Sequence, residues 1–317
     1  MYSTSFSSSA VIVRSLFASS VFRTSAVETC QGLGWQRRGT PGTPCTKDLV
    51  RQPGGLTVAL ELCLQDESDG YLSVVGRLTD AAAQANSLEE VGHRPWPLNP
   101  QPWFMGQTWQ RLLFAHWPVA HDLLRPHVPR ELTLEEWDGS AWIGLTPFRV
   151  TGLRLRGIPP LPLLSSFYEL NCRTYVRHDD RPGIWFFSLD ASSAAAVAAA
   201  RLGYRLPYRH AGIEATEGRF SAKRNPGDVS FEARYRGAGD VHVAQAGTLE
   251  YFLVERYCLY SGGGRLRADI HHAPWPLQRA EAEVMVEGVS PVELEGDPIC
   301  HYAHRQDVLV WRPESIS

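Results

Sequence analysis

A polar stripe inside an apolar β-hairpin is the feature that most limits how this 317-residue chain can fold. Residues 167–176 and 183–191 both predict strands, because aromatic and aliphatic side chains dominate them and a short polar turn separates them. Glu169, Asn171 and Arg173 recur at every second position, so they share one face of the first strand. Polar groups among so many aromatic neighbours indicate a lined cavity.

The pairing of the two strands is open between two registers. In the first, Arg173 faces Phe187, and large apolar side chains wall the stripe, namely Trp185, Phe187 and Leu189. In the second, Arg173 lies opposite Ser188 and Asn171 opposite Asp190, which gives a polar cluster able to bind a carboxylate through the guanidinium. A third interpretation places the stripe on a partly solvated outer face of the sheet.

The chain divides at a proline-dense segment, residues 95–102, which can propagate neither helix nor sheet. Residues 1–100 are predicted to be a largely disordered or loosely structured N-terminal extension, with one helix at 80–91. Residues 101–317 show short apolar runs separated by turns, the pattern of an antiparallel β domain. Asp138-Gly139 predicts a tight hairpin turn, and the alanine-rich residues 192–202 predict a helix capped by Asp190 or Ser192. The fold class is therefore mainly β with a few helices.

Composition excludes several classes of partner. A net charge of -3 and a pI near 6.4 argue against nucleic acid and against an anionic membrane. No apolar run is long enough to span a bilayer. The Ser-rich residues 1–26 fit either a disordered extension or a targeting segment.

The six cysteines form no C-x-x-C pair, which disfavours a zinc ribbon or a redox motif. Cys172 and Cys258 lie in apolar strand-like runs and are expected to be buried, reduced thiols. We therefore expect a reducing, cytoplasmic location.

Histidine and lysine give little support for metal or amine chemistry. His271-His272 and the pair His301 and His304 point to opposite faces of a strand, so neither pair can chelate one ion, and we predict no metal and no cofactor. A cross-strand site of His116 with His271 is possible geometrically, but a hydrogen-bonded core or rim histidine is favoured. The chain has two lysines, Lys47 and Lys223, and Lys223 lies in a polar, turn-like stretch.

The chain resembles the YqjF-like family of uncharacterised proteins in the acetoacetate decarboxylase-like superfamily. The resemblance spans about residues 109–311 and is carried by seven segments: Leu113-Phe-Ala-His-Trp-Pro-Val119, Arg156-Gly-Ile-Pro-Pro-Leu-Pro162, Glu169-Leu-Asn-Cys-Arg-Thr-Tyr-Val176, Trp185-Phe-Phe-Ser-Leu-Asp-Ala191, Leu206-Pro-Tyr208, Glu255-Arg-Tyr257 and His271-His-Ala-Pro-Trp-Pro-Leu-Gln278. It implies an antiparallel β domain curved into a cone or barrel around a cavity.

The resemblance also implies a site. In the decarboxylase relatives, strand-borne glutamates and an arginine line the cavity, and a lysine after the helix forms a Schiff base with a keto acid. Glu169 and Arg173 match the first part. The segment after the helix here has no lysine and places Tyr208 near the expected position. Without that electron sink, decarboxylation lacks a means of stabilising the carbanion.

We therefore expect a cavity that binds a small organic acid or carbonyl compound, with any catalysis proceeding without a Schiff base. The predicted catalytic residues are Glu169 and Tyr208. The predicted ligand-binding residues are Arg173, Asn171, Ser188, Asp190, Trp185, Phe187 and His116. Two alternatives remain, a Schiff-base enzyme that uses Lys223 and a non-enzymatic binding or structural protein. The expected partner is a small molecule, and a homo-oligomer is compatible with the sequence.

Overall fold

Seven curved strands close into a ring in the computed structural model, which describes residues 80–160, 165–224, 227 and 229–316. Around the ring the strands are β1 (Met105–Val119), β3 (Ala141–Leu155), β4 (Phe167–His178), β5 (Arg181–Ala191), β10 (Cys258–Ser261), β11 (Leu266–His271) and β13 (Ile299–Val310). β13 pairs with β1 along most of its length, and two further pairs, Ile270 with Val310 and His271 with Leu309, close the ring at β11. The predicted β barrel is confirmed, but the sheet is mixed and not purely antiparallel, because β10 and the short strand at residues 208–210 both run parallel to β5.

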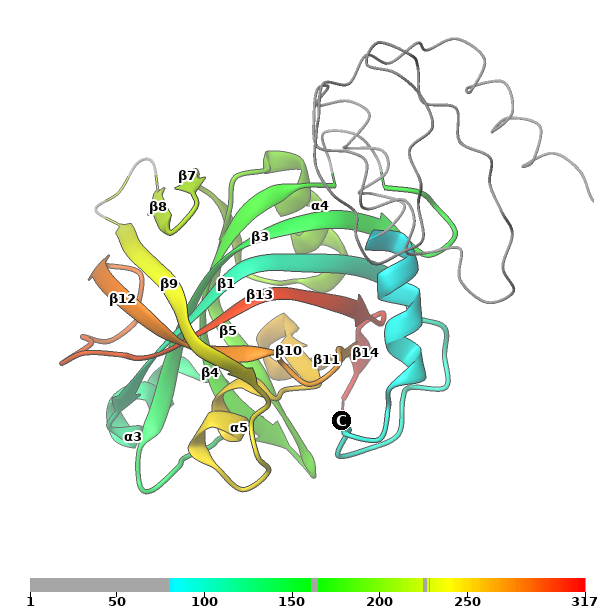
Figure 1. Ribbon diagram of the computed structural model, residues 1–317. Coiled ribbons are helices and arrows are strands. Elements are labelled where there is room, and N and C mark those ends of the chain that lie inside the picture. Colours follow the sequence, from blue (N-terminus) through cyan, green and yellow to red (C-terminus); the bar gives the residue numbers. More distant parts are fainter. Residues whose placement is uncertain (1–79, 161–164, 225–226, 228, 317) are drawn as a thin grey trace, which may run out of the picture. The chain divides into compact units, whose positions relative to one another are not determined.

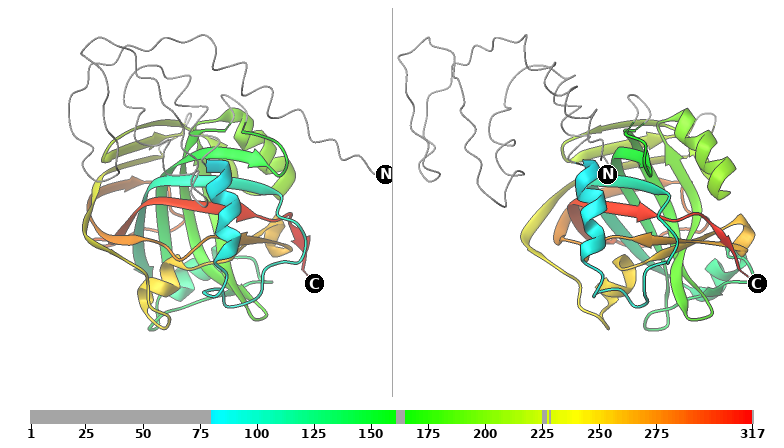
Figure 2. Two further views of the ribbon diagram at one scale, coloured as in Figure 1. Left: turned by 45° about the vertical axis from the view of Figure 1, so that its right-hand side comes forward. Right: turned by 90° about the vertical axis from the view of Figure 1, so that its right-hand side faces the viewer.

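Four more strands continue the sheet away from the ring. They are β12 (Leu277–Glu287), β9 (Ser230–His242), β8 (Arg219–Lys223) and β7 (Gly212–Thr216), in that order from β13 (Figures 1 and 2). The inner face of this extension carries Phe220 and Phe231, which belong to the same buried cluster as Leu170 and Cys172 of β4. The outer face of β4 is therefore covered by a second layer of sheet.

Short elements complete the fold. Three strands of two or three residues pair at the margins, β2 (Thr133–Leu134), β6 (Tyr208–His210) and β14 (Glu314–Ser315). Besides a helical segment at residues 80–86, the helices are α3 (His121–Leu124), α4 (Ala194–Tyr204) and α5 (Leu249–Val254), with 3-10 turns η2 (Ser87–Glu89), η3 (Arg125–His127) and η4 (Gly262–Gly264). The predicted alanine-rich helix is present as α4, but its cap is Ser193, whose side chain accepts from the Ala196 N–H, and neither Asp190 nor Ser192 has this role.

The register of the β4–β5 hairpin follows the first predicted register at Asn171 and departs from both predicted registers at Arg173. Asn171 pairs with Leu189, and Arg173 pairs with Phe186, because a register shift between Cys172 and Arg173 leaves Phe187 without a partner. An extra residue in one strand reverses which side chains share a face beyond it. This bulge could not be anticipated from alternation alone.

Residues 80–100 pack on the β domain, although we expected them to belong to a loosely structured extension. Residues 80–86 are helical and lie across the ends of several strands (Figure 1). Gln84 Nε2 donates to Thr108 Oγ1 and to the Gly152 carbonyl, both at 3.1 Å, and Arg154 donates to Gln84 Oε1 at 2.9 Å. The prediction for residues 1–79 lies outside the described residues.

Two expectations from the composition can be compared with the described residues. Cys172 and Cys258 are free and buried, as predicted. Within those residues, none of the helices has the length and apolar character needed to cross a bilayer.

Candidate functional site

The polar stripe of β4 is buried inside the ring. Glu169, Asn171 and Arg173 are 3%, 5% and 5% exposed, so the solvated-face interpretation is wrong. Their face of the strand adjoins a buried cluster to which β1, β3, β4, β5 and β13 all contribute, whereas the alternate residues Leu170 and Cys172 face the second sheet layer. The period-two pattern thus separates an inner polar row from an outer apolar row.

Arg173 has no counter-charge among the residues that the structure describes. No carboxylate in the described part of the chain lies within 4.0 Å of its guanidinium. Its hydrogen bond to the Leu253 carbonyl is long, 3.4 Å, and its Nε has no partner. The guanidinium carbon lies 5.4 Å from the Phe114 ring centre and 6.0 Å from that of Tyr175. Burial lowers the pKa of Arg173 from its usual value.

His116 and Arg173 lie in one row across three strands, on either side of Gly144. A Cβ at Gly144 would lie 2.9 Å from His116 Cδ2 and 3.3 Å from the Tyr175 hydroxyl, so only glycine leaves room between them. Within the described part of the chain, neither ring nitrogen of His116 has a hydrogen-bond partner. Burial, with the Arg173 charge, holds the pKa of His116 well below its usual value, so its imidazole is neutral at pH 7.

Unpartnered polar atoms gather along this inner face. Thr146 pairs with Asn171 across the strands, and neither Thr146 Oγ1 nor Asn171 Oδ1 has a partner. Two indole N–H groups of the same region, those of Trp142 and Trp275, are also unpartnered. Buried polar groups are almost always hydrogen-bonded, so this concentration of donors and acceptors indicates a place for a polar ligand or ordered water.

Glu169 and Tyr208 form a second polar group at the other end of the stripe. The Tyr208 hydroxyl, held by β6 beside β5, donates to Glu169 Oε2 at 3.0 Å. Burial raises the pKa of Glu169 to about 8, although hydrogen bonds from Tyr208 and Asn171 act in the opposite direction. The carboxyl is therefore protonated at neutral pH and can donate a proton or a hydrogen bond.

Four predicted binding residues do not join the site. Ser188 and Asp190 pair with Cys172 and Leu170, on the outer face of β4. Arg224 holds both of them, through Asp190 Oδ1 at 2.8 Å and Ser188 Oγ at 2.6 Å. Trp185 and Phe187 also pack in the outer cluster. The bulge at Phe187 explains these misplacements, because it exchanges the two faces of β5.

Lys223 is exposed at the end of β8, where it pairs with Gly212 and Ser230. This exposed position on the sheet extension lies outside the buried polar row of β4, so it gives no support to the hypothesis of a Schiff-base enzyme that uses Lys223. Lys47 lies outside the described residues.

The histidines are separated in the structure as well. His271 Nε2 bonds to the Ser87 carbonyl at 2.7 Å and His271 Nδ1 lies 3.2 Å from Arg94 Nη1, so both ring nitrogens have partners other than His116. Burial lowers the pKa of both His271 and His272 to about 4. Across the described ranges, no three histidine, cysteine or acidic side chains are placed to hold one metal ion.

Sequence reasoning missed the contribution of β3. Trp142, Gly144, Thr146 and Phe148 alternate along it, and the last three pair with Arg173, Asn171 and Glu169. The signal was present as a glycine and a threonine two residues apart in an otherwise apolar strand. Its meaning depends on the pairing with β4, which no local pattern specifies.

Comparisons with known proteins agree with this architecture. The family model DUF2071, described as an uncharacterized conserved protein, matches residues 106–307. YqjF, an uncharacterized protein of Bacillus subtilis, is 43% identical over 220 residues, which is 66% of this chain and 91% of that protein.

One solved structure is similar enough to show the fold. Acetoacetate decarboxylase of Legionella pneumophila aligns with a TM-score of 0.51 at 14% identity, over 71% of this chain and 93% of that chain. The enduracididine biosynthesis enzyme MppR, solved with pyruvate, aligns with a TM-score of 0.47 at 11% identity, over 71% and 93%. The likeness to acetoacetate decarboxylase shows a decarboxylase-like fold and, at this identity, nothing of the reaction.

Proposed function

Since this chain belongs to the DUF2071 family of uncharacterized conserved proteins, its function has to be inferred from the ring interior, and we propose that this interior binds a small organic acid. Arg173 binds the carboxylate, and the neutral imidazole of His116 lies beside it. The Thr146 and Asn171 oxygens accept from, or bridge through water to, the body of the ligand.

The unpaired guanidinium is the observation that carries this proposal. A charge that is 5% exposed and lacks an ionic partner costs several kcal/mol unless an anion compensates it. A carboxylate matches the planar fork of arginine and supplies that anion. The orphaned Arg173 Nε is the donor that such a ligand would satisfy.

Glu169 gives the site a capacity for acid catalysis. Glu169 is four residues from Arg173 on the same strand, roughly 13 Å away, so the two side chains do not form an ion pair with each other. Protonated at pH 7, it can donate to a carbonyl or hydroxyl oxygen of the bound acid, while Tyr208 fixes its orientation. The chemistry we assign is therefore proton transfer or carbonyl polarisation.

A thermal-shift screen with acetate, propionate, pyruvate and acetoacetate tests the binding. An acid present at about one hundred times its Kd stabilises the folded state by about 2.7 kcal/mol, which is roughly 5–10 °C in Tm for a domain of this size. Arg173→Met should abolish that shift. The proposal is wrong if no acid raises the Tm, or if the shift is the same in the variant.

A further inference from the structure

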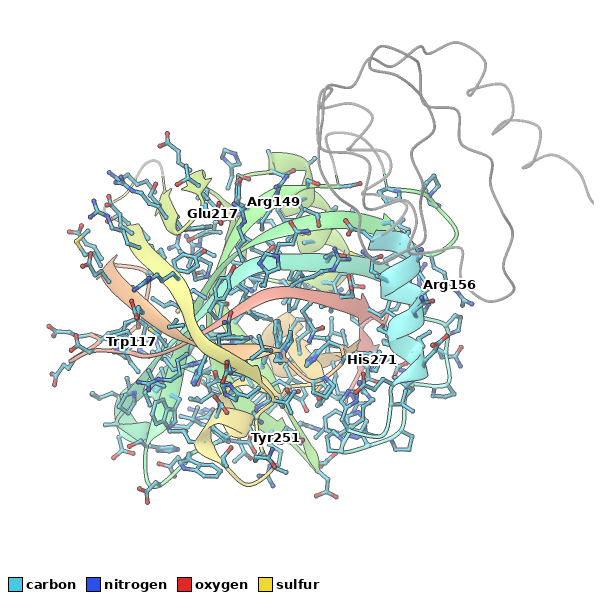
Figure 3. All side chains as sticks on the ribbon, viewed as in Figure 1. Trp117, Arg149, Arg156, Glu217, Tyr251 and His271 are labelled. Carbon is cyan, nitrogen blue, oxygen red and sulfur yellow. The ribbon has the colours of Figure 1, made fainter. Side chains whose placement is uncertain are left out.

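A cleft of about 200 Å³ opens beside α5, at the end of the ring nearest Arg173. Five of its twelve lining residues are aromatic, and the short segment from Gly247 to Tyr257 supplies seven of the twelve; Tyr251 of α5 is labelled in Figure 3. The aromatic side chains in the lining are Trp96, Trp137, Tyr251, Phe252 and Tyr257. None of the residues assigned above to the polar site lines this cleft.

The charged groups of the cleft are already satisfied. Glu135 accepts from Arg256 Nη1 at 2.6 Å and from Arg177 Nη2 at 2.8 Å. Glu255 accepts from the Tyr257 hydroxyl and from the Trp275 backbone N–H, at 2.5 and 2.9 Å. The cleft therefore presents aromatic surface without a free charge, which suits an uncharged, apolar group.

One aromatic side chain separates the cleft from the proposed carboxylate site. The Tyr175 ring lies 5.1 Å from the ring of Phe252 and 5.0 Å from the Arg256 guanidinium carbon, both of which line the cleft. Arg173 lies over the same Tyr175 ring, at 6.0 Å. The Tyr175 hydroxyl and Arg173 both donate to the Leu253 carbonyl, so α5 joins the two places directly.

We propose that the cleft is the second half of the ligand site and takes a planar apolar substituent of the acid bound by Arg173. The preferred ligand is then an aryl-substituted carboxylic acid, in which the ring occupies the cleft and the carboxylate reaches the guanidinium past Phe252. This inference rests on the proposed function, because it specifies the substrate class of that same site.

Size and chemistry support the assignment. An apolar protein cavity of about 150 Å³ accommodates benzene, so a cleft of about 200 Å³ has room for one phenyl ring. Rings of Trp137 and Phe252, whose centres are 5.6 Å apart, offer tilted faces to such a group. A second carboxylate in the same position would meet no free cation, since Arg256 is paired.

Three probe acids that differ in a single substituent test the proposal. Propionate, 3-phenylpropionate and succinate carry hydrogen, phenyl and carboxylate at the same carbon, and isothermal titration calorimetry gives their Kd values. Burial of a phenyl ring should make 3-phenylpropionate bind at least about tenfold more tightly than propionate. Succinate should gain nothing over propionate.

Substitutions separate the two halves of the site. Trp137→Ala should remove most of the phenyl preference and leave the propionate Kd unchanged, whereas Trp103→Ala, which removes an indole outside the cleft, should keep the preference. Arg173→Met should abolish the binding of both acids. If no acid binds, the proposed function fails. If acids bind through Arg173 but 3-phenylpropionate binds no more tightly than propionate, only the cleft assignment is wrong. The same conclusion follows if Trp137→Ala keeps the preference for 3-phenylpropionate.

Discussion

Arg173→Met is expected to stabilise the unliganded protein, which is an unusual outcome for a buried substitution. The variant removes a guanidinium that is 5% exposed and has no carboxylate partner among the described residues. Arg256→Met is the matched control, since Arg256 is also 5% exposed and lies over the same Tyr175 ring, but it pairs with Glu135 at 2.6 Å. The two substitutions therefore differ mainly in whether the lost charge was compensated.

The magnitudes follow from what each guanidinium contacts. Arg173 gives up a long hydrogen bond of 3.4 Å and two cation–π contacts, together about 1–2 kcal/mol. Against this, the desolvation of an unpaired buried charge costs several kcal/mol, so methionine should raise the free energy of unfolding by about 1–3 kcal/mol. Arg256→Met leaves Glu135 buried with only Arg177, and it should cost about 3 kcal/mol.

Urea unfolding at pH 7, followed by tryptophan fluorescence, measures both effects. The buffer must contain no carboxylate, because a bound acid would stabilise the wild type and hide the difference. For a domain of roughly 200 residues, 1 kcal/mol corresponds to about 2–4 °C in Tm, so the two variants should separate by 8 °C or more. Addition of propionate should raise the Tm of the wild type and of Arg256→Met, and leave that of Arg173→Met unchanged.

A loss of stability in Arg173→Met comparable to that in Arg256→Met would refute the reasoning. It would mean that contacts within the protein already compensate the Arg173 charge, and that no ligand anion is required. A gain in stability together with retained propionate binding would place the anion elsewhere. Only the combination of higher stability and lost binding supports an arginine held for a ligand.

Three further predictions test other parts of the site. Burial raises the folded-state pKa of Glu169 to about 8, above its unfolded value, so the stability it contributes is lost as pH rises toward 8. Denaturant titrations at pH 6.5 and 8 should show a decline about 2 kcal/mol larger in wild type than in Glu169→Gln, because every other titrating group is common to the two proteins and cancels in the comparison. Gly144→Ala should cost about 1–3 kcal/mol and weaken acid binding, since the new Cβ would lie 2.9 Å from His116, whereas Gly92→Ala, with nothing within 4 Å, should change neither. Asp190→Asn should lower stability by about 1–3 kcal/mol through its buried ion pair on the outer face, yet leave the propionate Kd unchanged; a loss of affinity would contradict the observed register.

Features that depend on local periodicity could be predicted from the sequence. Alternation of Glu169, Asn171 and Arg173 correctly predicted a buried polar row, because the side-chain period of a strand is two wherever the strand is regular. Asp138 and Gly139 both have positive φ, 51° and 75°, and form the predicted tight turn. These outcomes needed no knowledge of distant pairings.

Features set by long-range pairing could not be predicted in the same way. The bulge at Phe187 leaves Ser188 and Asp190 on the outer face of the sheet. A single added residue in an apolar strand cannot be recognised from its sequence. The partner of Asp190, Arg224, comes from the second sheet layer, 34 residues along the chain. The row of His116, Gly144 and Arg173 depends on how β1, β3 and β4 pair, so its geometry cannot be inferred from any one strand.

The two ends of the polar stripe are complementary in charge state. If Glu169 were ionised at pH 7, its carboxylate would partly balance the charge of Arg173. It would also repel the carboxylate of a ligand acid. Burial instead keeps Glu169 protonated and His116 neutral, so Arg173 alone carries charge and the interior is positive. A positive interior with a neutral acid at its far end attracts an anion and still retains a proton to give to it. The same burial that makes Arg173 costly to the unliganded protein thus suits both parts of the proposed interaction with an organic acid.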